Sequence, residues 1–179
     1  VHNKMDRCDA SERLMSMLTH VVMANEPNLI RKLLNTLSPL NGKIELNEVR
    51  GYVSSPKLAE IYVRGQHGAG AGLVAVGDTY LDARTMLADR SQKTYAVSIH
   101  DLDRFLEGKE VIKEPGFRDV NATRIEVWSF DPATLPPDQL TLAVALSYTI
   151  REFQQNERAA GAVNELIEPL GFIVPEREY

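Results

Sequence analysis

The fold assignment depends on one stretch, Gly65-Gln-His-Gly-Ala-Gly-Ala-Gly-Leu-Val-Ala-Val-Gly-Asp-Thr-Tyr80, in which four glycines fall within the first eight positions. Glycine concentrates where a backbone bends sharply or approaches a ligand closely. A phosphate-binding loop would place such glycines between a strand and a helix, so that the helix N-terminus holds the phosphates. Here the apolar run 73–76 favours a strand after the glycines, and no Lys-Ser or Lys-Thr pair follows. We therefore interpret residues 65–72 as a glycine-rich loop that leads into a β-hairpin.

The segments around this loop follow the order of a winged helix. Two strand-like runs, 73–76 and 79–81, flank Gly77-Asp78, and glycine in the first position suits a type II′ turn. Upstream, a proline in the first turn and a glycine at the end frame a helix over 56–64, although the Ile-Tyr-Val run also favours a strand over 60–64. In a winged helix the third helix enters the DNA major groove and the hairpin contacts the backbone. The matching order here is helix 26–37, strand 43–46, helix 47–52, helix 56–64 and hairpin 73–81.

The remaining periodicities predict an α+β fold. Residues 124–130 alternate as a strand with apolar groups on both faces, which is typical of a central strand. Further patterns predict helices over 11–24, 83–90, 101–107 and 136–155, a strand over 94–99, and a last helix from Asn156 to Glu168-Pro169. The predicted fold has N-terminal helices with a winged-helix-like unit, a small mixed or antiparallel sheet and a C-terminal helix pair. Because residues 110–121 resemble a loop, we divide the chain into 1–108 and 109–179, with one continuous domain as the alternative.

Composition excludes several classes of protein. The chain is 44% hydrophobic and 25% charged, as in ordinary globular domains, and no apolar run approaches the ~18 residues of a membrane-spanning helix. We therefore expect no membrane partner. The one cysteine, Cys8, excludes an internal disulfide and favours the cytoplasm.

Charge is distributed unevenly and points to nucleic acid as one partner. Residues 1–65 carry nine Lys or Arg against seven Asp or Glu, whereas residues 66–179 carry eleven against eighteen. Phosphate neutralisation needs cations on and near the reading helix, and the candidates are Lys43, Arg50, Lys57 and Arg64. The acidic hairpin tip counts against a DNA-contacting wing, and winged helices also serve as protein-interaction modules.

Two alternatives to DNA binding remain open. In the first, the chain is a protein-interaction subunit of a larger complex, or a homodimer, with its acidic C-terminal part facing a basic surface. In the second, the chain is a small enzyme whose loop closes over an anionic ligand, with His67 as acid or base and Arg64 as anion clamp. The candidate ligand-binding residues of this loop are His67, Gly68, Gly70 and Gly72.

No pattern predicts a metal or cofactor site. The pair His100-Asp101 resembles the His-Asp pair of metal-dependent phosphohydrolases, but Asp101 is also the natural N-cap of the helix that follows. We assign no catalytic residue, no metal and no cofactor. The hypothesis favoured by the sequence is a non-catalytic binding or regulatory module.

Overall fold

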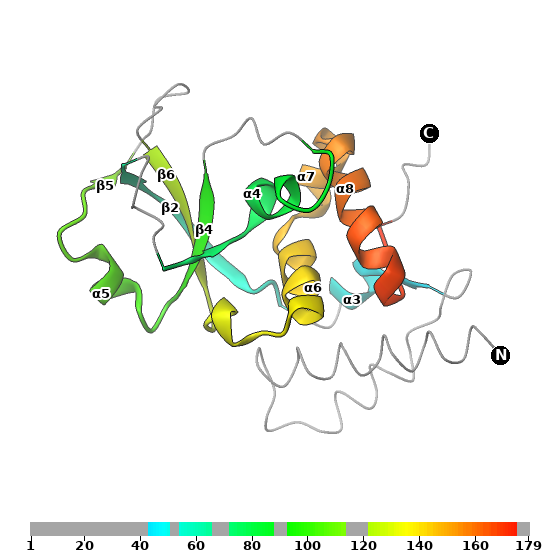
Figure 1. Ribbon diagram of the computed structural model, residues 1–179, viewed down its shortest axis with the longest axis horizontal. Helices are drawn as coiled ribbons and strands as arrows, with labels where there is room; N and C mark the ends of the chain where they lie inside the picture. The colour runs from blue at the N-terminus through cyan, green and yellow to red at the C-terminus, as the bar shows by residue number, and fades with distance from the viewer. Residues whose placement is uncertain (1–42, 51–53, 66–71, 88–92, 114–121, 175–179) are drawn as a thin grey trace. The chain divides into compact units, whose positions relative to one another are not determined.

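The chain forms two compact units. The computed structural model describes residues 43–50, 54–65, 72–87, 93–113 and 122–174 (Figure 1). One unit combines Val1–Ser55 with Leu135–Tyr179, and the other is the continuous segment Pro56–Thr134. The domain boundary predicted after residue 108 falls inside this continuous unit. The helices predicted over 11–24 and 26–37 lie outside the described residues.

The continuous unit is built on a five-stranded mixed sheet. Its strand order is β3-β4-β6-β2-β5, and only β4 and β6 run parallel. The strands are β2 (Lys57–Arg64), β3 (Val74–Ala75), β4 (Thr94–Ser98), β5 (Val111–Ile112) and β6 (Ala122–Trp128). The α+β class and the mixed sheet are confirmed.

One apolar cluster of this unit lies on one face of the sheet. β6 is the central strand, as its two apolar faces predicted, and Ile125 pairs with Ile61 of β2. Ile125 packs in a cluster with Val63 and Val97, against which the short helix α5 (Leu102–Leu106) places Phe105. Each fully buried aliphatic side chain contributes about 1.5–3 kcal/mol, so this cluster fixes α5 to the sheet.

The helix predicted over 56–64 is wrong, because these residues form β2. Leu58, Ile61 and Tyr62 lie at helical spacing, which suggested an amphipathic helix. The β-branched and aromatic run 61–63 is equally suited to a strand, and pairing with β6 satisfies its backbone groups. The alternative strand reading of 60–64 is therefore the correct one.

The hairpin predicted over 73–81 is also wrong. β3 is a strand, but α4 (Gly77–Asp82) is a helix. Gly77, Tyr80 and Leu81 are its buried residues, at the i, i+3, i+4 spacing of a helix, and Gly77 has a φ of 58° that suits glycine. After α4 the described residues 83–87 form turns, not the start of the helix predicted over 83–90. Neither the reading helix nor the hairpin of a winged helix is present among the described residues.

The other unit contains the C-terminal helices. They are α6 (Pro137–Ser147), α7 (Ile150–Gln155), α8 (Glu157–Ile167) and the 3₁₀ turn η2 (Glu168–Leu170). The single helix predicted over 136–155 is broken, because Thr149 caps a new helix by accepting a hydrogen bond from the backbone N–H of Glu152. Asn156 separates it from α8, as predicted, and accepts from the N–H of Ala159 at 3.1 Å.

Two short segments near the N-terminal end of the described chain complete this unit. β1 (Ile44–Glu45) pairs in parallel with β7 (Phe172–Ile173), and α3 (Leu46–Arg50) follows at once. They match the predicted strand 43–46 and helix 47–52 in type and place. No helix among the described residues is long and apolar enough to cross a membrane.

Arg50 caps the C-terminus of α6. Its guanidinium donates to the carbonyl oxygen of Leu146 at 3.1 Å and to that of Ala145 at 3.3 Å, and it lies 5.7 Å from the ring centre of Phe153. The last four carbonyls of a helix have no partner within the helix and carry a partial negative charge. The half-buried Arg50 therefore satisfies two acceptors at this end and joins α3 to the C-terminal helices.

We predict that Arg50→Met lowers the free energy of unfolding by about 2 kcal/mol, the typical loss when charged hydrogen bonds are removed from buried acceptors. Methionine keeps the apolar stem but donates no hydrogen bond. The measurement is urea unfolding of the full chain. The matched control is Arg158→Met, at an exposed position of α8, which should change stability little. Equal losses in the two variants would contradict the capping role.

Candidate functional site

The continuous unit contains an open pocket of about 340 Å³. Its walls come from the residues leading into β3, from β4, from the start of α5 and from the 3₁₀ turn η1 (Pro132–Thr134). The described lining residues are Gly72, Leu73, Val74, Ala96, Val97, Ser98, Asp101, Arg104, Phe105, Asp131 and Ala133. Segments far apart in the sequence therefore meet at one concave surface.

The apolar part of the lining continues the core of the unit. Val97 belongs to the buried cluster, and Leu73 and Phe105 pack against it. Beside the pocket, the ammonium of Lys109 lies 4.3 Å from the ring centre of Phe105 and donates to the Phe105 carbonyl at 2.8 Å. The apolar part of the lining is thus supported by packed side chains.

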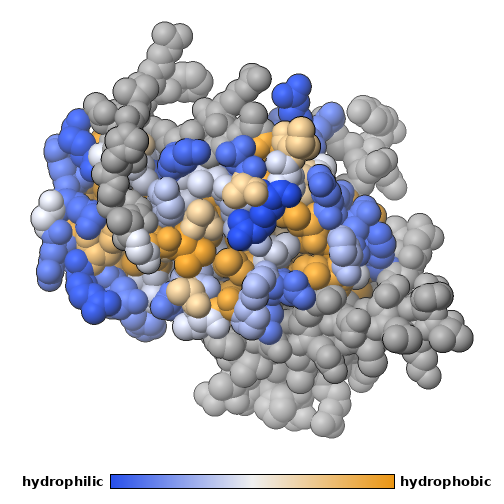
Figure 2. Space-filling view, viewed as in Figure 1, coloured by the Kyte–Doolittle hydropathy of each residue, from blue (hydrophilic) through white to orange (hydrophobic). Residues whose placement is uncertain are grey.

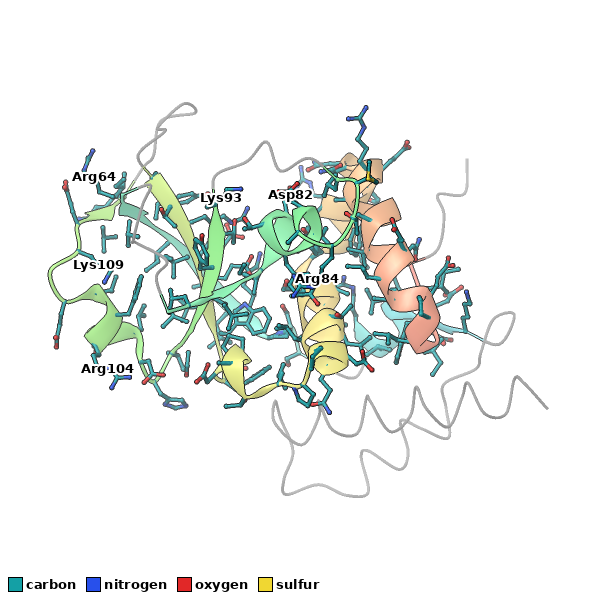
Figure 3. All side chains as sticks on the ribbon, in the orientation of Figure 1. Arg64, Asp82, Arg84, Lys93, Arg104 and Lys109 are labelled. Carbon is teal, nitrogen blue, oxygen red and sulfur yellow. The ribbon has the colours of Figure 1, made fainter. Side chains whose placement is uncertain are left out.

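The polar part of the lining is held by short-range hydrogen bonds. Arg104 donates to Asp101 Oδ1 at 3.2 Å, and the Arg104 side chain is 79% exposed. Asp131 Oδ1 accepts from the backbone N–H of Ala133 at 2.9 Å, and Ser98 Oγ accepts from the N–H of His100 at 3.2 Å. Figure 3 shows Arg104 and Lys109 at the α5 end of the unit, and Figure 2 shows mainly hydrophilic side chains over α5 and β5 on this side.

Two residues singled out in the sequence line this pocket. Gly72 ends the glycine-rich loop with a φ of 80°, a left-handed conformation that favours glycine. Asp101 precedes α5 as its N-cap residue, but its carboxylate bonds Arg104 rather than the helix backbone. His67, Gly68 and Gly70 lie outside the described residues.

His100, the neighbour of Asp101, is exposed and is not among the described lining residues. In the part of the chain that the structure describes, no group of three or more His, Cys, Asp or Glu could hold a metal ion.

The four cations proposed for nucleic-acid binding are divided between the units and paired with acceptors. Lys43 pairs with Glu168 at 3.3 Å, and Arg50 caps α6. Lys57 and Arg64 lie at opposite ends of β2, where they pair with Glu60 at 2.6 Å and with Glu110 at 2.8 Å.

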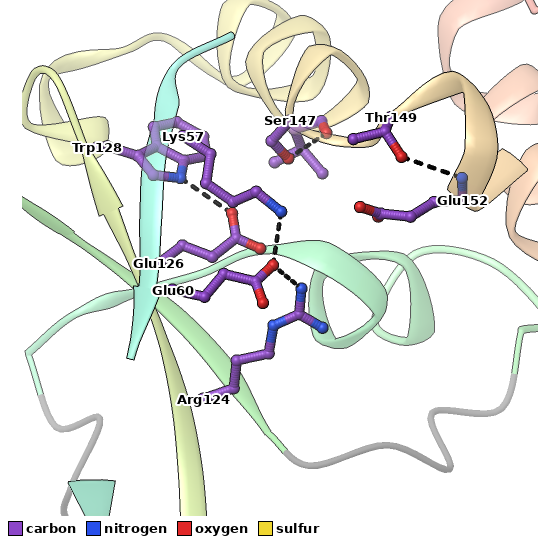
Figure 4. Close-up of polar contacts among 9 residues, drawn as sticks. Lys57, Glu60, Arg124, Glu126, Trp128, Ser147, Thr149 and Glu152 are labelled. Atoms are coloured by element: carbon purple, nitrogen blue, oxygen red, sulfur yellow. Dashed lines mark hydrogen bonds and ion pairs between the residues drawn. The ribbon is translucent and has the colours of Figure 1, made fainter. Parts of the chain in front are cut away.

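A second polar assembly lies on the sheet face opposite the apolar cluster (Figure 4). Glu60 of β2 accepts hydrogen bonds from Lys57 of the same strand and from Arg124 of β6. Glu126 Oε1 accepts a hydrogen bond from the Trp128 indole N–H at 3.0 Å. Glu126 is only 3% exposed. The register places Glu60 opposite Glu126, which brings two carboxylates and two cations onto one face.

These surroundings shift the two carboxyl groups in opposite directions. Burial would raise the pKa of Glu60, but the Lys57 hydrogen bond and the Arg124 charge outweigh it and lower that pKa. Burial raises the pKa of Glu126, and the Trp128 hydrogen bond with the two cations offsets only part of the rise. The sequence analysis missed this network. Charged residues at alternate positions of an otherwise apolar strand, 124 and 126, were the available signal.

The network supports the sheet and does not enter the pocket. Neither Glu126 nor any other member is among the described lining residues. No protein-family model, curated protein or solved structure matches the chain.

We predict that Glu126→Gln stabilises the protein at neutral pH. A carboxyl group whose folded pKa is raised binds its proton more tightly in the folded state. Its stabilising contribution is therefore present below the unfolded pKa of about 4.3 and is lost as the pH rises through the folded pKa. Glutamine is always neutral and keeps an oxygen for Trp128, so the gain in Tm over the unsubstituted protein should grow between pH 4 and pH 7.

The matched control is Glu107→Gln, which removes the same charge from an exposed position. Its effect on Tm should not follow the pH in this way. A loss of stability in Glu126→Gln at pH 7 would mean that the charged carboxylate, paired with Lys57 and Arg124, is the stabilising form.

Proposed function

We propose that the protein is a non-catalytic binding module that takes a small ligand into the pocket of its continuous unit, Pro56–Thr134. The observation that carries the proposal is a pocket of about 340 Å³ whose described lining combines apolar and charged side chains. Small-molecule sites are concave, mainly apolar and provided with a few polar groups, and their volumes begin near 300 Å³.

The pocket is built on ordered elements, which supports a binding role. β4 lies within the sheet, between β3 and β6, and α5 is fixed by Phe105 and its apolar neighbours. Sites on packed strands and helices lose little entropy when a ligand binds, because their side chains are already positioned.

The lining favours binding over catalysis. Its one described hydroxyl, on Ser98, accepts a backbone hydrogen bond, and no histidine, cysteine or lysine is among the described lining residues. Nucleophilic catalysis needs a nucleophile beside a base. The carboxyl group with the raised pKa, Glu126, is not part of the described lining. These features support the binding alternative of the sequence analysis and give less support to a small enzyme.

Nucleic-acid binding receives less support than a small ligand. Lys57 and Arg64 of the continuous unit each pair with a carboxylate, so neither offers an uncompensated charge to a phosphate. The proposed setting is the cytoplasm, because a single cysteine suits a reducing compartment.

We predict that filling the pocket abolishes ligand binding. A screen of small metabolites by thermal shift should find compounds that raise Tm, since a ligand at 100 times its Kd stabilises the folded state by about 2.7 kcal/mol. Ala133→Trp places a bulky ring at the exposed rim and should remove these shifts. The control Ala83→Trp adds the same ring at an exposed position outside the described lining and should keep them. A screen without any shift, or equal responses of both variants, would contradict the proposal.

A further inference from the structure

The pocket has three charged residues among its described lining, and two of them compensate each other. Asp101 and Arg104 form an ion pair at 3.2 Å, one turn apart at the start of α5. Asp131 remains, and none of the described cations pairs with it. Among the described lining residues, one negative charge is therefore left without a paired cation.

Asp131 is held in a defined orientation. Its Oδ1 accepts from the Ala133 N–H at 2.9 Å, and its backbone oxygen accepts from the N–H and the hydroxyl of Thr134 at 3.1 Å and 2.7 Å. A carboxylate oxygen has two lone pairs, and the second oxygen, Oδ2, has its full capacity for a donor. The side chain thus presents a fixed anionic acceptor at the rim of the pocket.

The described lining also contains apolar side chains, one of them aromatic. They include Leu73, Val74 and Phe105, and an ammonium already lies against Phe105, because Lys109 is 4.3 Å from the ring centre. An aromatic ring attracts a cation through its negatively charged face. The Phe105 ring already has the Lys109 ammonium against it, so the Asp131 carboxylate is the feature that favours a positively charged group over the anion expected from the sequence.

We infer that the ligand is a small organic amine, whose ammonium group binds Asp131 and whose apolar body covers the side chains of Leu73, Val74 and Phe105. The inference rests on the proposed function, because it assigns a chemical class to the ligand of the same pocket. The ammonium supplies the donor and the charge that Asp131 lacks, and the body displaces water from apolar side chains.

The inference is tested with three probes that share one apolar body: hexylamine, hexanol and hexanoate. Isothermal titration of the full chain should give hexylamine a Kd at least tenfold below that of hexanol, with hexanoate weakest. Asp131→Asn should weaken the binding of hexylamine until its Kd is about that of hexanol. Asparagine keeps an oxygen for the Ala133 N–H, so the turn is preserved while the charge is removed. Asp103→Asn removes the same charge from an exposed position of α5 outside the described lining, and should leave the hexylamine Kd unchanged.

The outcomes separate this inference from the proposed function. If the three probes bind equally and Ala133→Trp abolishes their binding, the pocket binds a ligand but the inference that the ligand is an amine is wrong. If hexanoate binds most tightly, the ligand is an anion and the inference of an amine is wrong. Unchanged hexylamine binding in both Asp131→Asn and Ala133→Trp would place the amine elsewhere on the protein and overturn the inference. If no probe binds and no metabolite shifts Tm, both the inference and the proposed function are wrong.

Discussion

The pairing of β2 with β6 is the constraint on which the continuous unit depends. Seven residues of β2 find partners on β6, with one irregularity between Lys57 and Ala59. Because side chains alternate along a strand, this register decides at once what lies on each face. In this register Ile61 and Ile125 lie on the face of the apolar cluster, and Glu60 and Glu126 lie on the face of the ionic network. A shift of one strand by one residue would exchange its two faces and would place its charged side chains against α5.

Burial of Glu126 explains why a hydrogen-bond donor and two cations lie near it. A carboxyl group that is 3% exposed costs free energy unless its charge is removed or compensated. Trp128 donates to Glu126, and the two cations nearby lower the cost of any remaining charge. The pKa of Glu60 is lowered and that of Glu126 is raised, so the surroundings give two residues of the same type different acidities. Replacing a buried ion pair by apolar side chains is often neutral or stabilising, so a network of this kind does not by itself indicate high net stability.

Local patterns predicted part of the fold and failed where tertiary pairing decided. The strands near 94–99 and 124–130 and the helix near 101–107 were found because their periodicity is unambiguous. In β2 the spacing of Leu58, Ile61 and Tyr62 suits a helix as well as a strand, and only the partner strand resolves the ambiguity. In α4 the Gly77-Asp78 pair has the sequence of a hairpin turn. Which residues of this segment are buried, and hence their helical spacing, is known only from the folded structure. For the pocket, Gly72 and Asp101 had local signals. Arg104 and Asp131 had none, because their role depends on chain segments meeting in space.

The cap that Arg50 places on α6 has a consequence for biosynthesis. It joins residues on either side of the continuous unit, since α3 precedes Pro56 and α6 follows Thr134. During translation, Pro56–Thr134 leaves the ribosome as one uninterrupted segment, and domains generally fold as units in the order in which they emerge. The guanidinium of Arg50, by contrast, has no helix to cap until residues 137–147 have been made. The unit with the pocket can therefore mature first, and a nascent chain halted soon after residue 134 would already contain every described residue of the pocket lining, while the C-terminal part of the other unit had not been made.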